Sequence, residues 1–355
     1  MSILVTIAAF VVVLSFLVLI HELGHFWAAR ILGIRVRELG IGFPPRLKGI
    51  WRNGIVYSLN WIPVGGFVRL EGESDPTVPD GYAGKPVWAR ATVLVAGSAV
   101  NILFAWFIFS ALASLPVERL VDSEIVIQEV VPGSPADEAD LRVGDVIRGV
   151  DGQDVLTLGQ LSDRISRADG NAIELRVMRG SVPLAVYLAP RANPPPGEGP
   201  MGVSIRLLNP VFERRAAPVW QAPWNGIVLM GNVITGTATE IRRAISSSTN
   251  PGIAGPVGIA QATGEAAQDG PISLLIIVAL LSLNLGILNL LPIPALDGGR
   301  IPFLILEVVR RGRRLSPERE NVVHLIGFVF LLSMVLFVTV GIDLPRLLQG
   351  DSILP

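Results

Sequence analysis

Four long, strongly apolar stretches of this 355-residue chain contain no Asp, Glu, Lys or Arg, and they limit its fold more than any other feature. The hydrocarbon core of a membrane is about 30 Å thick, and a helix needs about 20 residues to cross it. The sequence therefore predicts an α-helical polytopic membrane protein with about four transmembrane helices. The stretches are Ile3–Ile20, Ala91–Val117, Ile272–Leu296 and Val322–Ile342.

The composition agrees with a membrane protein and excludes several kinds of site. Half of the residues are hydrophobic and only 17% are charged. The net charge of −1 argues against a nucleic-acid partner, because a phosphate-binding surface needs an excess of basic residues. The chain has no cysteine, so disulfides and Cys-ligated metals are excluded.

The distribution of Lys and Arg orients the predicted spans. Residues 27–90 contain nine basic residues, and residues 300–322 contain six, including the run RRGRR. Because short loops rich in Lys and Arg stay in the cytoplasm, these two loops are predicted to be cytoplasmic. Both termini and the long segment between the second and third spans are then predicted to face outward. The first stretch has no basic n-region and no small-residue cleavage pattern, so it is interpreted as a retained span rather than a signal peptide.

The segment 122–190 has the composition of a small soluble domain. EIVIQEVV and AIELRVMRG alternate like half-buried strands, and TLGQLSDRISRA has a helical period. GSPA and LRVGDVIRGVDG resemble the PDZ domains of bacterial proteases, a fold that binds extended peptides at a sheet edge. A β-rich domain that only blocks access sterically is the alternative.

Two further segments separate this domain from the third apolar stretch. RANPPPGEGPMG, at 191–202, is rich in Pro and Gly and is interpreted as a semi-rigid linker. The segment 224–241 is moderately apolar but interrupted by Gly, Asn and Thr. It is interpreted as an interfacial or membrane-dipping helix, because a fifth span would put RRGRR outside.

The pentapeptide HELGH, from His21 to His25, ends the first apolar stretch. On a helix the two histidines share a face and can bind one metal ion, while Glu22 can reach a water molecule beside it. Zinc lowers the pKa of such a water to about 7, and Glu22 is predicted to take its proton as general base. A lone histidine in a helix is more often a core residue, but ionisable groups at the end of an apolar span are costly and usually functional.

A catalytic zinc needs a third protein ligand. Without cysteine, this ligand must be a carboxylate or His324, the remaining histidine. Asp297, in NLLPIPALDGGR, ends another apolar stretch at the same predicted depth and is preferred. The alternative for Asp297 is a helix-terminating turn, and for His324 a helix-lining side chain. The sequence thus predicts one Zn²⁺ per chain, bound by His21, His25 and Asp297, with zinc inferred from ligand type.

HELGH, NLLPIPALDGG and the PDZ-like segment between them together resemble the site-2 proteases, the intramembrane zinc proteases of peptidase family M50. The resemblance spans nearly the whole chain and favours the RseP branch. It implies that His21, His25 and Asp297 bind zinc and that Glu22 is the catalytic acid and base.

Smaller motifs agree with this resemblance or depart from it. GSAVN, at 97–101, resembles the GPxxN signature of the family with Ser98 in place of Pro, and helix packing through small residues is its alternative. GPVGIAQ, at 255–261, also recurs in relatives. Ala295 stands where Pro or Val is common, and a single PDZ domain replaces the two of RseP.

The substrate of such a protease must unwind locally, because the amides of an intact helix are already bonded, and its freed backbone groups then need partners. Asn284 and Asn289 are predicted to supply such partners. Pro292 and Pro294 are predicted to break the third helix so that its backbone lines a wet cavity. In the family a membrane-dipping β-hairpin offers an edge to the extended substrate. The segment 35–72 alternates like strands separated by Gly and Pro turns, which is compatible with such a hairpin. A cytoplasmic β-rich loop is the alternative.

The predicted function is an intramembrane zinc endopeptidase that cleaves single-span membrane proteins. The resemblance implies substrates such as anti-sigma factors in regulated intramembrane proteolysis, or remnant signal peptides. It also implies a bacterial inner membrane, with the PDZ domain outside and the active site near the cytoplasmic face. A non-catalytic adaptor with a degenerate protease fold is one alternative, against which the complete set of motif residues argues. An ion transporter is the other, although the two halves show no repeat.

These assignments give the following predicted boundaries: 1–33 for the first transmembrane helix, 34–89 for the membrane-associated β-rich loop, 90–117 for the second helix, 122–190 for the PDZ domain, 191–271 for the linker and interfacial helix, 272–299 for the third helix, 300–321 for the basic loop, 322–343 for the fourth helix and 344–355 for the tail.

Overall fold

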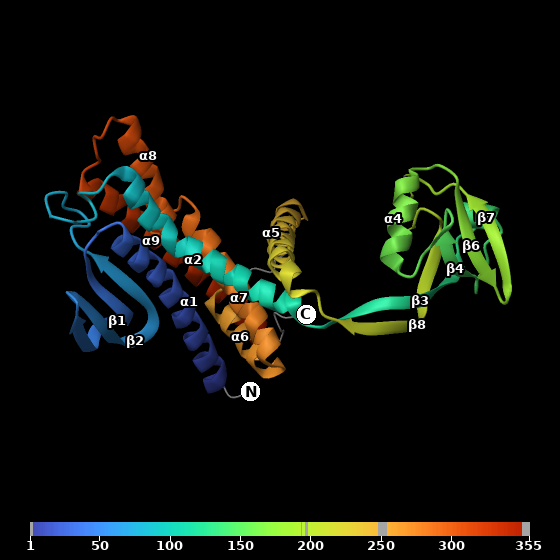
Figure 1. Ribbon diagram of the computed structural model, residues 1–355, viewed down its shortest axis with the longest axis horizontal. Coiled ribbons are helices and arrows are strands. Elements are labelled where there is room, and N and C mark those ends of the chain that lie inside the picture. The colour runs from blue at the N-terminus through green and yellow to red at the C-terminus, as the bar shows by residue number, and fades with distance from the viewer. Residues whose placement is uncertain (1–2, 193, 196–197, 248–253, 350–355) are drawn as a thin grey trace. The chain divides into compact units, whose positions relative to one another are not determined.

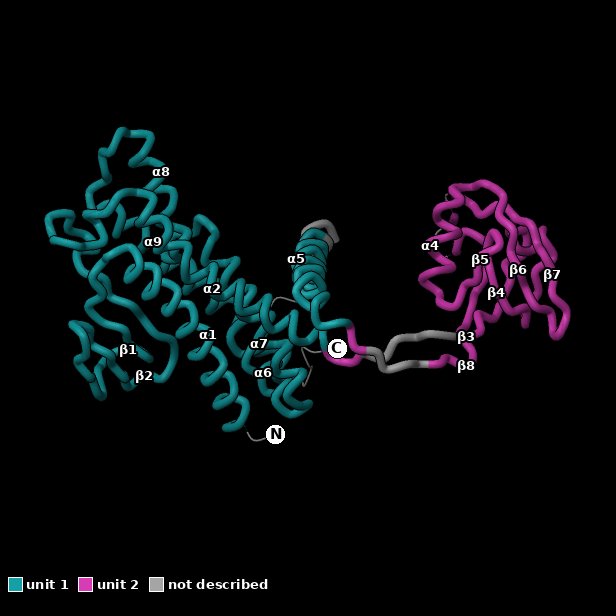
Figure 2. The backbone as a smooth tube through the Cα atoms, viewed as in Figure 1, with its two compact units in different colours: residues 1–114, 218–355 teal, residues 115–217 magenta. Residues whose placement is uncertain are grey.

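The computed structural model describes residues 3–192, 194–195, 198–247 and 254–349. It divides into two compact units (Figure 2). Unit 1 combines Met1–Ser114 with Pro218–Pro355, and unit 2 is the inserted segment Leu115–Ala217.

Unit 1 contains long helices and one β-hairpin (Figure 1). Its elements are α1 (Ile3–Ile31), β1 (Val36–Arg52), β2 (Ile55–Leu70), α2 (Val87–Ser114), η1 (Val219–Gln221), α5 (Ala222–Ser247), α6 (Pro256–Asp269), α7 (Pro271–Leu290), η2 (Asp297–Arg300), α8 (Ile301–Val309), α9 (Pro317–Val338), η3 (Thr339–Asp343) and α10 (Leu344–Gln349).

Four helical segments of the described chain are long and apolar enough to cross a membrane. They are Ile3–Ile31, Val87–Ser114, Pro271–Leu290 and Pro317–Leu348. Many of their large apolar side chains are exposed, including Phe107 at 66% and Phe337 at 71%. Such surfaces suit lipid rather than water. The predicted polytopic fold class, with its hairpin and inserted domain, is therefore confirmed.

The third of these helices, α7, ends at Leu290, and residues 291–296 of the predicted segment 272–299 are not helical. Pro292 and Pro294, which were predicted to break this helix, lie in the non-helical part, because proline has no N–H to donate and its ring excludes a continuing helix. The chain then makes the single turn η2, which begins at Asp297.

Helix α2 lies at the centre of unit 1, where it packs against α1, α5 and α7. Its contact with α1 is very close at Gly24, since a Cβ atom there would lie only 2.5 Å from the carbonyl oxygen of Ala96. Farther along, α1, α2 and α7 bury a common apolar cluster: Val13, Leu17, Ala105, Ile108, Phe109, Val278, Ala279 and Leu283.

The hairpin follows α1 directly. β1 and β2 are antiparallel and meet at Asn53 and Gly54, whose φ angles are +51° and +79°. A two-residue turn with both φ angles positive is the usual connection for a tight hairpin, and Asn-Gly is its preferred sequence. Trp51 and Trp61 are 73% and 64% exposed, so the distal half of the hairpin presents aromatic side chains outward.

The segment 224–241 lies within α5, a continuous helix. α5 is not one of the four membrane-length apolar helices found among the described residues. Trp224 and Ile227 are 67% and 51% exposed on it. Its predicted interfacial position stays a prediction.

Unit 2 is an antiparallel sheet with one covering helix (Figure 1). The sheet order is β7-β6-β4-β3-β8, and β5 pairs with β4. Leu161 and Ile165 of α4 are one turn apart and join the core of the sheet. The elements are β3 (Val117–Val130), α3 (Pro135–Glu138), β4 (Val146–Val150), β5 (Gln153–Asp154), α4 (Leu158–Ala168), β6 (Ile173–Arg179), β7 (Val182–Leu188) and β8 (Val203–Arg215).

Unit 2 is wider than the predicted domain, 122–190, because β8 pairs with the whole length of β3. The interpretation of 191–202 as a linker is corrected for its described residues. The backbone N–H of Arg191 donates to the carbonyl of Pro200 at 2.8 Å, and Met201 is buried in the core. Proline and glycine therefore mark a loop that returns to the sheet.

Candidate metal centre

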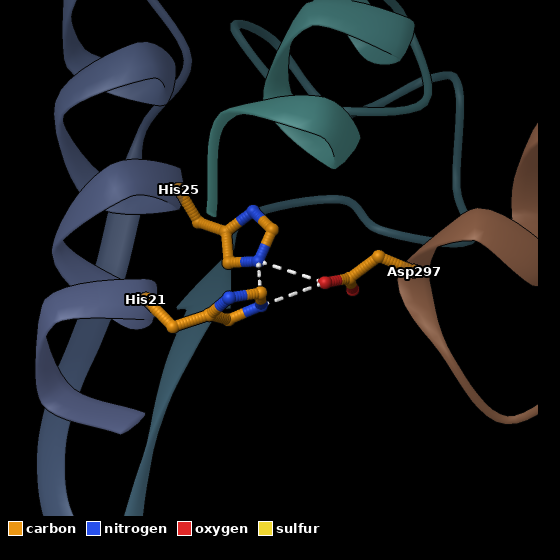
Figure 3. Close-up of side chains that lie close together, drawn as sticks. All are labelled: His21, His25 and Asp297. Carbon is orange, nitrogen blue, oxygen red and sulfur yellow. Dashed lines mark hydrogen bonds and ion pairs between the residues drawn. The ribbon is translucent and has the colours of Figure 1, made fainter. Parts of the chain in front are cut away.

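Helix α1 presents His21 and His25 on one face, four residues apart (Figure 3). Their Nε2 atoms are 3.1 Å from each other. Both imidazoles are buried, with 5% and 9% of the residue exposed. Two nitrogen atoms so close together, pointing at one position, are a suitable pair of ligands for a cation.

Asp297 reaches the same position from the turn after α7 (Figure 3). Its Oδ2 atom lies 2.8 Å from Nε2 of His21 and 3.1 Å from Nε2 of His25. The carboxylate of Asp297 thus meets both imidazoles in one polar cluster.

These three residues fit a zinc ion. Among the described residues, they form a group of His, Asp or Glu ligand atoms close enough together for one metal ion. Tetrahedral zinc with bonds of about 2.0–2.2 Å separates neighbouring ligand atoms by roughly 3.3 Å. The observed separations of 2.8–3.1 Å need to open by only a few tenths of an ångström. The role of the three residues as ligands stays a prediction.

Helix α2 supports the two histidines from behind. Nδ1 of His25 donates to the carbonyl of Val93 at 2.8 Å, which leaves Nε2 free to bind a metal. One turn farther along, a Cβ atom on Gly97 would lie 2.5 Å from Nε2 of His25 and 2.7 Å from Nε2 of His21. Only glycine therefore leaves room for the imidazoles. The sequence identified Gly97 as part of the GSAVN motif, but it did not predict that Gly97 contacts the histidines.

The loop that carries Asp297 is held by glycines and by a buried ion pair. Gly298 packs so closely on the end of α7 that a Cβ atom would lie 2.5 Å from the carbonyl carbon of Leu290. Beyond the turn, Glu307 of α8 accepts a hydrogen bond from Arg90 of α2 at 2.6 Å. These contacts fix the loop against α2, and sequence reasoning missed the ion pair because its partners are 217 residues apart.

Glu22 lies beside the cluster and lines the same cavity of about 450 Å³ as His25 and Asp297. The backbone N–H of Val68, in β2, faces its carboxylate. The cavity also contains the polar groups of Glu73, Tyr82 and Arg300, so part of its wall can be hydrated. Glu22 is thus placed next to the ligands without belonging to the metal cluster.

His324 is not part of the cluster. It lines the cavity, but its Nδ1 accepts a hydrogen bond from the backbone N–H of Ala295 at 2.9 Å. Ala295 has a φ angle of +81°, which is rare for a residue with a Cβ atom. His324 therefore holds the strained loop before Asp297 in place.

The four predicted substrate-binding residues lie near the cluster in sequence but do not line this cavity. Asn284 is exposed on α7 and Asn289 is half-buried near the end of that helix. Pro292 and Pro294 occupy the unwound segment that follows. Their predicted contacts with substrate stay predictions.

Comparison with known proteins gives consistent results. A sequence model of Peptidase family M50 matches residues 9–334. The chain is 30% identical to a candidate zinc metalloprotease of Agrobacterium fabrum, with 94% of each chain covered. It is 32% identical to a candidate zinc metalloprotease of Nostoc sp., covering 96% of this chain and 95% of the relative. It is 28% identical to the zinc metalloprotease RasP of Bacillus licheniformis, covering 96% and 99%.

Proposed function

The chain belongs to peptidase family M50 and is a multi-pass zinc metalloprotease, and from this premise we propose that it cleaves the transmembrane segments of single-span proteins within the membrane. One observation carries the proposal. Two long apolar helices, α1 and α7, bring His21, His25 and Asp297 together, and Glu22 lies in the adjoining cavity. A metal site in this position can act on a peptide bond at membrane depth.

Each residue has a distinct role in the proposed reaction. His21, His25 and Asp297 would hold the zinc ion. When bound, zinc supplies a Lewis acid that makes water a nucleophile at neutral pH. Glu22 accepts a proton from the attacking water and gives it to the amine nitrogen as the peptide bond breaks. The surrounding apolar helices limit the access of bulk water.

The substrate has to enter in an extended conformation, because the carbonyls of an intact helix are shielded. The β2 strand lies beside the site, since Val68 faces Glu22 and lines the cavity. An unwound substrate could pair with this hairpin, as a strand adds to a sheet edge. Asn284 and Asn289 would bind backbone groups that the unwinding frees, at the segment broken by Pro292 and Pro294. Proteins such as anti-sigma factors or remnant signal peptides are the proposed substrates.

The proposed location is the inner membrane of a bacterium, since the relatives named above are bacterial. The loops 34–89 and 300–321 would face the cytoplasm because they are rich in Lys and Arg. Unit 2 would then lie outside, and the metal site near the cytoplasmic face.

The test is cleavage of a model transmembrane peptide by the purified protein in detergent. Glu22→Gln is expected to slow cleavage by roughly 10²–10⁴-fold, because it removes the proton acceptor. Zinc content should stay at one ion per chain, since Glu22 is outside the cluster. Glu318→Gln, on an exposed residue at the start of α9, is the control. Cleavage by Glu22→Gln at the parent rate would refute the mechanism, and zinc binding without any cleavage by the parent would favour the adaptor.

A second function is proposed for unit 2, which is capture of a peptide. A groove of about 150 Å³ lies between α4 and β8, lined by Leu161, Ile165, Val203 and Ile205 among others. β8 is an edge strand, so it has backbone groups available to an added strand. An apolar groove beside a free strand edge is the arrangement by which PDZ domains bind peptides, and assignment to that fold is part of the proposal.

This function is tested with fluorescent peptides that end in an apolar residue, with either a free carboxylate or an amide. Ser162 lines the groove from α4, so Ser162→Trp is expected to fill it and weaken binding. Asp163→Trp, on the neighbouring exposed residue outside the groove, is the control. Equal binding by both variants would place the peptide elsewhere, and no binding by the parent would favour steric exclusion alone.

A further inference from the structure

Asn101 of α2 is a fully buried amide beside the metal cluster. Its exposed fraction is 0%. Its Nδ2 atom lies 3.4 Å from Nδ1 of His21, while Oδ1 has no hydrogen-bond partner among the described residues. A buried carbonyl oxygen without a donor is unfavourable, and native structures rarely leave one.

Rotating the amide would give the buried oxygen a donor. The oxygen and nitrogen of an Asn amide occupy nearly the same positions, so which one faces a neighbour is an assignment. If Nε2 of His21 binds a metal, the hydrogen of the neutral ring is on Nδ1, which then needs an acceptor. With the amide rotated, Oδ1 occupies the position 3.4 Å from Nδ1 and becomes that acceptor.

We propose that Asn101 is a positioning residue of the metal centre, accepting the Nδ1 hydrogen of His21 and thereby presenting Nε2 to the metal. The proposal rests on the zinc site of the proposed function. In this arrangement Asn101 provides a hydrogen-bond acceptor for Nδ1 of His21. The backbone carbonyl of Val93 does the same for Nδ1 of His25. Val93, Gly97 and Asn101 are four residues apart and so share one face of α2. One helix face thus supplies an acceptor to each histidine and the space between them.

The backbone of Asn101 is also tied to the other half of the site. The hydroxyl of Ser282, in α7, donates to the carbonyl of Asn101 at 2.8 Å. Ser282 is itself fully buried. Asn101 therefore links α1, which carries two ligands, with α7, which leads to Asp297. Because Asn101 is fully buried where α2 meets α7, its side chain cannot turn to solvent.

The test compares Asn101→Leu and Asn101→Asp with Ser98→Ala in the full-length protein. Leucine has a similar size but no acceptor, and aspartate restores one. Ser98 is buried three residues earlier on α2, and its hydroxyl has no hydrogen-bond partner in the described part of the chain, so Ser98→Ala controls for altered packing. Zinc affinity is measured by competition with a chromophoric chelator. Asn101→Leu should bind zinc about 10–100-fold more weakly, the usual effect of losing such a partner. Asn101→Asp and Ser98→Ala should bind zinc as tightly as the parent.

A second readout follows the histidine ring directly. The chain has only three histidines, so nitrogen NMR of histidine-labelled protein can assign the tautomer of His21. The zinc-loaded parent should carry hydrogen on Nδ1 of His21, and Asn101→Leu should change this nitrogen signal. Zinc binding by Asn101→Leu equal to that of Ser98→Ala would overturn the proposal, as would an Asn101→Asp variant as weak as Asn101→Leu. A parent that binds zinc but cleaves no peptide would refute the protease function and leave this role of Asn101 intact.

Discussion

At the scale of single residues, two glycines determine how closely α1 and α2 approach. Gly24 lies against the backbone of Ala96, and Gly97 lies against both imidazoles. Any side chain at either position would separate the helices or displace a predicted ligand. The predicted metal site therefore depends on residues that have no ligand atom of their own.

Gly97→Ala is expected to weaken zinc binding by at least about 10-fold, since its Cβ atom would displace Nε2 of one or both histidines. Zinc content after dialysis against a weak chelator measures the effect. Gly231→Ala is the matched control, because Gly231 lies in α5 and a Cβ atom there would have no neighbouring atom within 4 Å. It should keep zinc and stabilise α5 by about 0.5–1 kcal/mol. Full zinc occupancy in Gly97→Ala would contradict this account of the packing.

The proximity of His21, His25 and Asp297 was predictable at this scale, whereas the contacts that support these side chains were not. His21 and His25 follow from a spacing within one helix, and Asp297 from the depth at which its apolar stretch ends. The contact between Gly97 and the imidazoles depends on which face of α2 meets α1. Periodicity does not determine that face, because α2 is apolar on nearly every side. GSAVN could therefore be recognised as a motif without revealing which of its residues support the metal site.

At the scale of elements, helix α6 is capped by a distant carboxylate. The backbone N–H groups of Gly255 and Gly258 donate to Asp343 at 2.9 and 3.0 Å. Asp343 is 2% exposed and belongs to η3, the turn that follows α9. A carboxylate at a helix N-terminus satisfies free N–H groups and interacts well with the helix dipole. This contact explains why GPVGIAQ begins with glycine, since a Cβ atom on Gly255 would lie 2.6 Å from Asp343.

Asp343→Ala should destabilise unit 1 by about 1–3 kcal/mol, because it leaves two buried N–H groups without an acceptor. The expected observation is a lower apparent Tm in detergent. Asp269→Ala is the control, since Asp269 is exposed at the other end of α6. Equal Tm values for the two variants would mean that the cap contributes nothing measurable.

Unit 2 contains an ion pair with a buried carboxylate, and this pair predicts a response to pH. Asp145 accepts two hydrogen bonds from Arg179, at 2.9 and 2.8 Å, and one from the backbone N–H of Arg142. Burial raises the pKa of Asp145, but these bonds lower it on balance. Its stabilising contribution is therefore complete above the unfolded pKa, near 3.9, and is lost as pH falls through the lower folded pKa.

Hydrogen exchange of β4 and β6 in the intact protein, corrected for intrinsic rates, is expected to show protection falling as the pH is lowered below about 4. Asp145→Asn should reduce protection at neutral pH and make it less dependent on pH. The exposed Asp163 provides the control substitution, Asp163→Asn. A parent and Asp145→Asn with parallel pH profiles would rule out this ion pair as the cause.

Elements whose apolar residues follow a helical or strand period were predicted well. Where only composition was used, as for the segment 191–202, the prediction was wrong. TLGQLSDRISRA forms α4, and EIVIQEVV lies within β3 except for its last residue. The Pro- and Gly-rich segment after β7 has no periodic pattern of apolar residues. The sequence therefore did not indicate that Met201 is buried in the core. The strand β8 was likewise missed, because its partner β3 lies more than 70 residues earlier, beyond the reach of local patterns.

At the scale of the whole molecule, the predicted metal ligands all belong to unit 1, and unit 2 interrupts that unit between α2 and α5. The interruption begins and ends on paired strands, because Val117 of β3 is the partner of Arg215 of β8. Antiparallel partners are only about 5 Å apart. The two ends of the insertion can therefore be joined by a short loop.

Replacing the residues between Val117 and Arg215 with a short Gly-Ser loop should leave zinc affinity unchanged. Cleavage of a short transmembrane peptide without a soluble domain should also persist. Zinc titration and the peptide assay check the two outcomes. A correctly folded deletion variant that lost zinc would show that unit 2 contributes to the metal site. Faster cleavage of a substrate with a bulky soluble domain would support steric exclusion, and slower cleavage would support peptide capture.

The paired strands at the base of unit 2 have an evolutionary consequence. A segment that leaves and re-enters its host through neighbouring strands can be gained, duplicated or exchanged by recombination without shifting the helices on either side. If unit 2 selects substrates as proposed, exchanging it would change which proteins are cleaved and leave the predicted zinc ligands in place.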